Sequence, residues 1–459
     1  MMRQRTEHRE DTGIPCLPDQ VPGIGSCPVG PRGESIRGML PDEVGKTMSE
    51  DPVLSLIDSE YPSLLDLYQE LHAHPELSGG EAWTAERLAG ELERAGYLVT
   101  RGVGGHGVVA VFANGEGPTL MVRADMDGLP VREETGLSYQ SRVRMQDARG
   151  REVDVMHACG HDIHMTSLVG AARILALLRD RWSGTLVLVG QPSEESVSGA
   201  ARMVADGVYS RFPRPDAGIA LHVAPDLPAG TIGYREGIFS AGSESLDIVI
   251  PGIGGHAAHP DQTRDPVVIA AQVIIAFQTI VSRELPPLEF GIITVASVHG
   301  GLKHNAIPDE VMLQVNIRYF RKPIRDLLLD AIKRVTEGVV KSAGLPASHI
   351  PGISLLPESV PPMTNDPALT SRVASALTRV LGTASVLRIE PLTGSEDFGV
   401  FGLVEPPLPL CYFRVGCADE TGSCGFLHSS RFSPSPAVIR DATRALVIAA
   451  MEILPGKTP

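Results

Sequence analysis

The chain has 459 residues, of which 43% are hydrophobic and 21% are charged, as is typical of a folded globular protein. This length exceeds what one core usually supports, and the net charge of −15 argues against nucleic acid or an anionic membrane surface as a partner. No run of 18 apolar residues predicts a membrane-spanning helix, and six cysteines are too few for a disulfide scaffold. We therefore expect two domains and a reducing, cytoplasmic location.

The first 50 residues lack apolar periodicity and are rich in proline, glycine and charge. Such a segment does not carry enough apolar surface to offset the entropy of ordering, so residues 1–50 are predicted to be a disordered extension.

Alternating helical and strand patterns follow. Ser59 can cap a first helix that has Pro62 in its first turn and apolar residues at helical spacing over 64–71. Helical spacing recurs over residues 85–92 and 168–178, and strand patterns cover residues 108–112, 119–123, 185–189 and 217–221. Polar residues stand where three of these strands end, namely Asp127, the pair Glu194 and Glu195, and His222. Apolar strands that alternate with helices predict an α/β sheet, and such sheets place their sites at strand ends.

The pattern changes near residue 240. A strand at 245–250, a helix at 265–284, strands at 292–298 and 311–317 and a helix at 323–341 give the β-α-β-β-α order of a split βαβ unit. The α/β pattern resumes with a helix from residue 366, strands at 385–389 and 410–415, and a helix at 436–453. We therefore predict one domain from residues 51–239 and 356–459, interrupted by an inserted domain of residues 240–355.

One octapeptide, HACGHDIH at residues 157–164, concentrates metal-binding chemistry. Cys159 and His161 are two residues apart, so in an extended segment their side chains face the same way and suit one metal ion. The alternative is a buried cysteine beside surface histidines. We interpret His157 as site lining, and we expect His164 to begin the following helix and not to bind metal.

Glu195, His222 and His428 complete a plausible set of nitrogen, sulfur and oxygen donors. The adjacent glutamates suit a division of labour in which Glu195 holds the metal and Glu194 accepts a proton. A solvated acidic face is the alternative interpretation of this pair.

Eight motifs stand in a recognisable order: LHAHPE (71–76), RADMDGLP (123–130), HACGHDIH (157–164), QPSEE (191–195), GGHAA (254–258), NAIP (305–308), GSEDF (394–398) and LH (427–428). With them, the chain resembles the di-metal amidohydrolase family that includes hippurate hydrolase, N-acyl-amino-acid amidohydrolases and the plant auxin-conjugate hydrolases. The resemblance covers residues 64–454. It implies an open mixed sheet with helices on both faces, like that of zinc peptidases, and an inserted ferredoxin-like α+β lid.

The resemblance also implies roles for residues. Two divalent ions, zinc or manganese with cobalt or nickel as further options, would be held by Cys159, His161, Glu195, His222 and His428. Glu194 would be the general base, and Asp127 would orient His161 or the metals. His256 would stabilise the substrate carbonyl oxygen, often across the interface of a homodimer formed through the lid. Asn305 and Arg318 would hold a substrate carboxylate.

The function implied is metal-dependent hydrolysis of the amide bond in N-acyl or aromatic-acyl amino acids, which are small molecules with a carboxylate. A dipeptidase or carboxypeptidase with the same site and a non-catalytic scaffold remain as alternatives. Residues 427–436 depart from the family's usual aromatic and acidic run. Nearby, Cys417 and Cys424 form a free thiol pair, a loop disulfide or, with His428, a separate zinc site.

Overall fold

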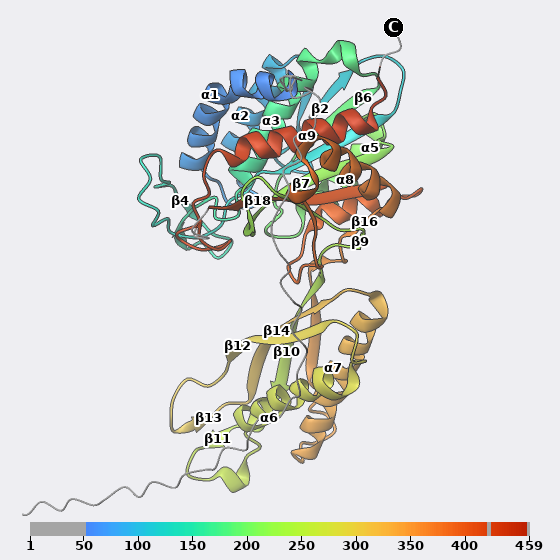
Figure 1. Cartoon of the computed structure of the whole chain (residues 1–459). Helices are drawn as coiled ribbons and strands as arrows, with labels where there is room; N and C mark the ends of the chain where they lie inside the picture. The colour runs from blue at the N-terminus through green and yellow to red at the C-terminus, as the bar shows by residue number, and fades with distance from the viewer. Residues whose placement is uncertain (1–51, 420–423, 457–459) are drawn as a thin grey trace, which may run out of the picture. The chain divides into compact units, whose positions relative to one another are not determined.

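The computed structural model describes residues 52–419 and 424–456, so the prediction for residues 1–50 lies outside the described residues. The principal helices are α1 (Pro52–Ala73), α2 (Ala82–Arg94), α3 (His161–Leu177), α4 (Gly199–Ala205), α5 (Val208–Arg211), α6 (Pro266–Thr279), α7 (Lys322–Ser342), α8 (Pro367–Leu381) and α9 (Val438–Ile453). Figure 1 shows these helices with the strands that they cover.

The larger sheet has eight strands in the order β1-β2-β6-β3-β7-β18-β8-β17. Their bounds are β1 Leu98–Val103, β2 Gly107–Ala113, β3 Thr119–Asp125, β6 Thr185–Gln191, β7 Ala217–Pro228, β8 Ile232–Tyr234, β17 Val386–Arg388 and β18 Leu410–Ala418. The four central strands β6, β3, β7 and β18 are parallel to their neighbours within this group, whereas β1, β2 and β8 add antiparallel pairings. The predicted mixed α/β sheet is thereby confirmed.

Helices cover both faces of this sheet. Alternate residues of one strand point to opposite faces, as on β18, where Phe413 belongs to one buried cluster and Tyr412 to another. The first cluster joins the sheet to α1, α2, α3, α8 and α9, and the second joins it to α4, α5 and the 3₁₀ turn Asp397–Gly402. Two buried faces explain why the central strands are mainly apolar.

The smaller sheet has four antiparallel strands in the order β12-β14-β10-β15, formed by β10 Gly242–Pro251, β12 Gly291–His299, β14 Glu310–Tyr319 and β15 Gly352–Val360. On β14, buried residues alternate with more exposed ones, and the buried set packs with α6 and α7 (Figure 1). This is the ferredoxin-like arrangement expected for the insert. Its last strand continues to Val360, five residues beyond the predicted boundary at 355.

Within the described part of the chain, the helical stretch from Pro266 to Glu284 is long and apolar enough to cross a membrane by length and composition alone. Its buried side chains Ile269, Val273 and Phe277 pack in the core of the smaller sheet. The high hydropathy is therefore accounted for in part by a core position.

Two helix starts, those of α6 and α8, have side-chain caps. Asp265 and Asp366 each precede a proline, and their carboxylates accept backbone N–H groups of the first turns of α6 and α8. The first helix was expected to begin after a Ser59 cap with Pro62 in its first turn, but α1 begins at Pro52 and contains both residues in its interior.

The loops that follow β3 and β6 and the middle of β7 bring the polar residues of the larger sheet together. His222 lies inside β7, which continues to Pro228, and not after the strand as expected. The site nevertheless occupies the carboxyl-end region of the parallel strands, where open α/β sheets form their clefts.

Candidate metal centre

The octapeptide turns sharply at Gly160, which adopts a left-handed conformation with φ of 82°. A Cβ atom there would lie 2.6 Å from Cγ2 of Val223, so a larger residue would clash. His161 then begins α3. Cys159 and His161 are therefore brought together by a tight turn and not, as we predicted, by an extended segment.

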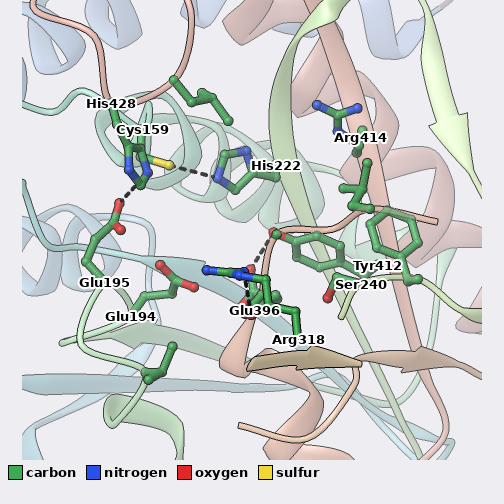
Figure 2. A pocket seen from close by; sticks show the side chains of 16 residues that line it. Cys159, Glu194, Glu195, His222, Ser240, Arg318, Glu396, Tyr412, Arg414 and His428 are labelled. Atoms are coloured by element: carbon green, nitrogen blue, oxygen red, sulfur yellow. Dashed lines mark hydrogen bonds and ion pairs between the residues drawn. The ribbon is translucent and has the colours of Figure 1, made fainter. Parts of the chain in front are cut away.

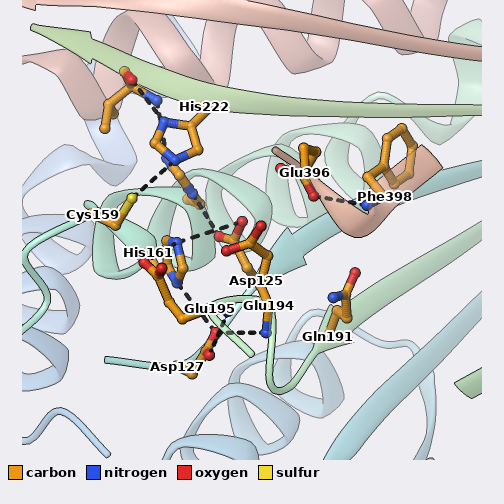
Figure 3. Close-up of polar contacts among 12 residues, drawn as sticks. Asp125, Asp127, Cys159, His161, Gln191, Glu194, Glu195, His222, Glu396 and Phe398 are labelled. Atoms are coloured by element: carbon orange, nitrogen blue, oxygen red, sulfur yellow. Dashed lines mark hydrogen bonds and ion pairs between the residues drawn. The ribbon is translucent and has the colours of Figure 1, made fainter. Parts of the chain in front are cut away.

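The predicted donors lie close to one another. Figure 3 shows Cys159, His161 and His222 together, with Sγ of Cys159 3.3 Å from Nε2 of His222. Oε1 of Glu195 lies 3.8 Å from Nε2 of His161 and 3.6 Å from Nε2 of His428. Three overlapping groups of donors, each within 4.8 Å, therefore link all five residues and include Glu194.

The chemistry of these donors fits divalent metal ions. Both ring nitrogens of His161 and Oε1 of Glu195 are buried and make no hydrogen bond with any described residue. Burial raises the pKa of the Cys159 thiol well above its ordinary value, and burial also raises the pKa of Glu195 to about 7. A cation offsets both effects, because thiolate and carboxylate are the metal-binding forms.

Asp127 lies directly behind the donors. Its Oδ1 is 3.4 Å from Nδ1 of His161, and its carboxylate accepts the backbone N–H groups of Glu194 and Glu195 at 3.1 and 3.0 Å. One carboxylate is thus placed to orient the His161 ring and to hold the turn that carries both glutamates.

His164 is buried in the first turn of α3. Its Nδ1 lies 2.6 Å from Oδ1 of Asp125, and its Nε2 accepts the backbone N–H of Val223 at 3.0 Å. Both ring nitrogens are therefore occupied by the protein, which favours the prediction that His164 is not a ligand.

A buried ion network that we did not predict lies beneath the centre. Arg123 on β3 pairs with Asp125 at 2.7 Å, Glu396 at 2.9 Å and Asp397 at 3.2 Å. Its members belong to two of the eight motifs, but the 273-residue separation hides the pairing in the sequence. The sequence offered one signal for this pairing, namely the arginine in the motif at 123–130 and the two carboxylates in the motif at 394–398.

A cavity of ≈ 320 Å³ opens in front of the donors. Figure 2 shows the donors at one side and Ser240, Arg318, Tyr412 and Arg414 at the other. Its lining residues are Cys159, Glu194, Glu195, Val197, His222, Phe239, Ser240, Arg318, Leu392, Gly394, Ser395, Glu396, Tyr412, Arg414, Leu427 and His428. Apart from Asp127, which lies behind the donors, the proposed catalytic-domain residues line this cavity or, as for His161, abut it.

The inserted domain contributes unevenly. Arg318 on β14 lines the cavity, and its Nη1 donates to Thr393 O and Ser395 Oγ, both at 3.0 Å. His256 and Asn305 are exposed at the paired strands β11 (Gly255–His256) and β13 (Ala306–Ile307) and are not among the cavity residues. The structure thus brings one of the three predicted insert residues to the site.

The loop with His428 has its own local restraints. His428 has φ of 64°, which is uncommon for a residue with a side chain, and its N–H donates to Ala158 O at 2.8 Å. Before it, Cys417 and Cys424 are both free thiols whose sulfur atoms are 3.8 Å apart. His428 lies with Cys159 and Glu195, so these three, and not the cysteine pair, form its donor group.

Comparison with known proteins agrees with this geometry. The model of peptidase family M20/M25/M40 matches residues 121–452. The chain is 34% identical over 369 residues to the IAA-amino acid hydrolase ILR1-like 2 of Arabidopsis thaliana, covering 80% of this chain and 79% of that one. It is 35% identical to the N-acetyl-L-cysteine deacetylase of Bacillus subtilis, covering 74% of this chain and 77% of that one.

It is also 31% identical to thermostable carboxypeptidase 1 of Saccharolobus solfataricus, covering 82% of this chain and 92% of that one. Among solved structures, a Bacillus subtilis protein described as a dinuclear metal-binding peptidase superposes with a TM-score of 0.69 at 27% identity. That match covers 86% of this chain and 98% of the other. The chain therefore belongs to peptidase family M20/M25/M40 and is a metal-dependent hydrolase of the amidohydrolase and peptidase type.

Proposed function

We propose that the protein hydrolyses the amide bond of N-acyl amino acids. The observation that carries the proposal is the composition of one cavity: five metal donors and Glu194 line or abut one wall, and Arg318 stands on the other (Figure 2). Arg318 donates only to the uncharged acceptors Thr393 O and Ser395 Oγ among the described residues, so its charge is available to a substrate carboxylate.

Glu194 is the proposed general base. Its side chain lines the cavity, while the backbone N–H groups of Glu194 and Glu195 are both held by Asp127. Burial, together with the charges of Glu396 and Glu195, raises the pKa of Glu194 well above its ordinary range. A carboxylate with a raised pKa accepts a proton from water more readily and can return it to the leaving amine.

Cys159, His161, Glu195, His222 and His428 are the residues proposed to hold two divalent ions, zinc or manganese, with cobalt or nickel as further options. When bound, such ions act as Lewis acids toward the substrate carbonyl and toward water. Asp127 lies beside the His161 ring and orients it. The contact between His164 and Asp125 holds the buried side chains next to that ring in place.

His256 and Asn305 are proposed to join the site from the insert. Neither lines the cavity, so they reach it by closure of the insert or from a second subunit. We propose a homodimer through the insert, because its edge strand β12 is unpaired on one side within the described residues. In addition, Val267, Val268 and Ile275 of α6 are exposed.

A carboxypeptidase activity is the second candidate, because Arg318 would serve the C-terminal carboxylate of a peptide equally well. The similarity to thermostable carboxypeptidase 1 supports keeping it. The two activities differ in the group that carries the scissile carbonyl. This group is a simple acyl group in an N-acyl amino acid and an amino acid residue in a peptide.

The deciding experiment is a hydrolysis screen with N-acetyl, N-benzoyl and indole-acetyl amino acids alongside dipeptides and longer peptides. The protein is first stripped with a chelator and then reloaded with zinc, manganese, cobalt or nickel. We expect metal-dependent release of free amino acid from N-acyl substrates. Cleavage of peptides alone would replace the proposed function by the second candidate.

A further inference from the structure

The wall of the cavity opposite the metal donors carries a buried hydroxyl without a partner. Ser240 is 3% exposed and lines the cavity, and its Oγ makes no hydrogen bond with any described residue. A buried hydroxyl in this state costs free energy, which a group entering the cavity recovers.

The backbone holds Ser240 in place. Its N–H donates to Met363 O at 3.3 Å, and it forms an isolated parallel bridge with Leu392. The residue stands just before β10, whose Ser243 is paired with Arg318 on β14. The hydroxyl is therefore presented by a fixed backbone at the point where the chain enters the smaller sheet.

Ser240 and Arg318 are attached to the same short segment. Ser240 bridges Leu392, whereas the Arg318 guanidinium donates to Thr393 O and to Ser395 Oγ. Figure 2 shows Ser240 on the side of the view away from Cys159 and His428, and the Arg318 side chain reaching from the insert toward the middle of the cavity. Residues 392–395 therefore contact both Ser240, whose hydroxyl is a neutral donor, and Arg318, which is a cation.

The other arginine of the wall is already neutralised. Arg414 donates through Nη1 to Asp226 Oδ2 at 2.8 Å and through Nη2 to Asp226 Oδ1. Arg318 instead contacts only uncharged acceptors among the described residues. Of these two arginines, Arg318 is therefore the one whose charge is available to an anionic group in the cavity.

We infer that Ser240 is a substrate-binding residue whose hydroxyl donates to the α-carboxylate of the leaving amino acid, with Arg318 on the same carboxylate. The inference rests on the proposed function, since it assigns the carboxylate end of the same site. It follows that Ser240 helps the enzyme to select N-acyl amino acids over N-acyl compounds without a carboxylate. The acyl group then lies toward the metal donors, where the scissile carbonyl must be.

The test compares Ser240→Ala with Ser243→Ala in the metal-loaded full chain. Ser243 is a matched control, because it is a buried serine three residues away whose Oγ accepts from Asn316 at 2.9 Å and which does not line the cavity. The substrates are N-acetyl-L-leucine and N-acetyl-L-leucinamide, which differ only in the carboxylate.

For Ser240→Ala we expect KM for N-acetyl-L-leucine to rise about tenfold with little change in kcat, and KM for the amide to stay unchanged. The melting temperature should stay the same or rise, because the lost hydroxyl has no partner in the free protein. Ser243→Ala should show the reverse, a lower melting temperature and an unchanged KM. In an Arg318→Gln background the effect of Ser240→Ala should shrink, since both residues hold one group.

An equal rise in KM for both substrates, or no change for either, would overturn the assignment while leaving the proposed function intact. A wild-type protein that hydrolyses none of the N-acyl amino acids in the hydrolysis screen would instead refute the proposed function. In that case the shift in melting temperature on adding each compound still measures binding. A stabilisation by N-acetyl-L-leucine that persists in Ser240→Ala would then reject the role of Ser240 by itself.

Discussion

The two sheets of this protein supply the site in different ways. The larger sheet brings five candidate metal donors and Glu194 together in a single chain, largely buried, and Asp127 accepts the backbone N–H groups of both glutamates. The smaller sheet brings only Arg318 to the cavity, while His256 and Asn305 stay exposed. The comparison separates a preassembled candidate metal centre from insert residues whose proposed roles in substrate binding require a movement or a second subunit.

The largest effect is expected where the preassembled centre carries out proton transfer. Glu194→Gln should lower kcat at least about 100-fold while metal content stays at the wild-type level, because the amide cannot accept a proton. Glu195→Ala should lose metal, and elemental analysis of the two purified variants measures this. Equal metal content in both variants would contradict the division of roles between the glutamates.

A smaller effect is expected on the side of the insert. His256→Ala should lower kcat about 10- to 100-fold with metal content unchanged, because an oxyanion donor acts in the transition state. If the histidine belongs to a partner subunit, mixing His256→Ala with Glu194→Gln should restore activity through one intact composite site. Verified subunit exchange without recovered activity would reject the shared site, and a monomer in sedimentation would reject the dimer.

A substitution at Gly160 tests whether the arrangement of the candidate metal donors depends on the backbone turn there. Gly160→Ala should weaken metal binding, because the added Cβ meets Val223 and the φ of 82° disfavours a side chain. Metal affinity measured by competition with a chelator is the readout. Gly136→Ala is a suitable control, since that glycine also has positive φ, of 76°, but faces open space. Equal losses in both variants would show that strain alone, and not the site, is responsible.

The smallest expected effect is on the pH dependence of stability. It concerns Glu91 on α2, whose carboxylate accepts a hydrogen bond from Arg173 on α3. Although burial opposes it, hydrogen bonds from Arg94, Arg87 and Arg173 lower the pKa of Glu91 to about 2. Because the folded pKa lies below the ordinary value of 4.5, the stabilisation is present above pH 4.5 and is lost as the pH falls through about 2. Glu91→Gln should cost about 2 kcal/mol at pH 7 and flatten the acid branch of denaturant-derived stability. An unchanged acid branch would contradict this.

The sequence predicted that the candidate metal donors lie close together, because each lies in a short motif of distinctive residue types. It also predicted the mixed α/β sheet and the ferredoxin-like insert, since periodicity and element order are local properties. The reason given for pairing Cys159 with His161 was wrong, because the left-handed turn at Gly160 is not visible in side-chain alternation.

Residues whose role depends on distant partners were missed. Arg123 reaches Glu396 and Asp397 only in the folded chain, because at least 273 residues separate them. Ser240 is noticeable only because it lines the cavity with a buried hydroxyl that has no hydrogen-bond partner among the described residues. The bounds of β15 and α1 were also missed, since packing and not local pattern extends them. The roles of His256 and Asn305 stay predictions.

The central claim is that the cavity of one chain holds the metal ions on which hydrolysis depends. The most direct test is to titrate chelated protein with zinc or manganese while recording both bound metal and hydrolysis of N-acetyl amino acids. The account predicts that activity is absent without metal and rises with occupancy to two ions per subunit, and that Glu195→Ala shows neither rise. Full hydrolysis by metal-free protein would contradict it.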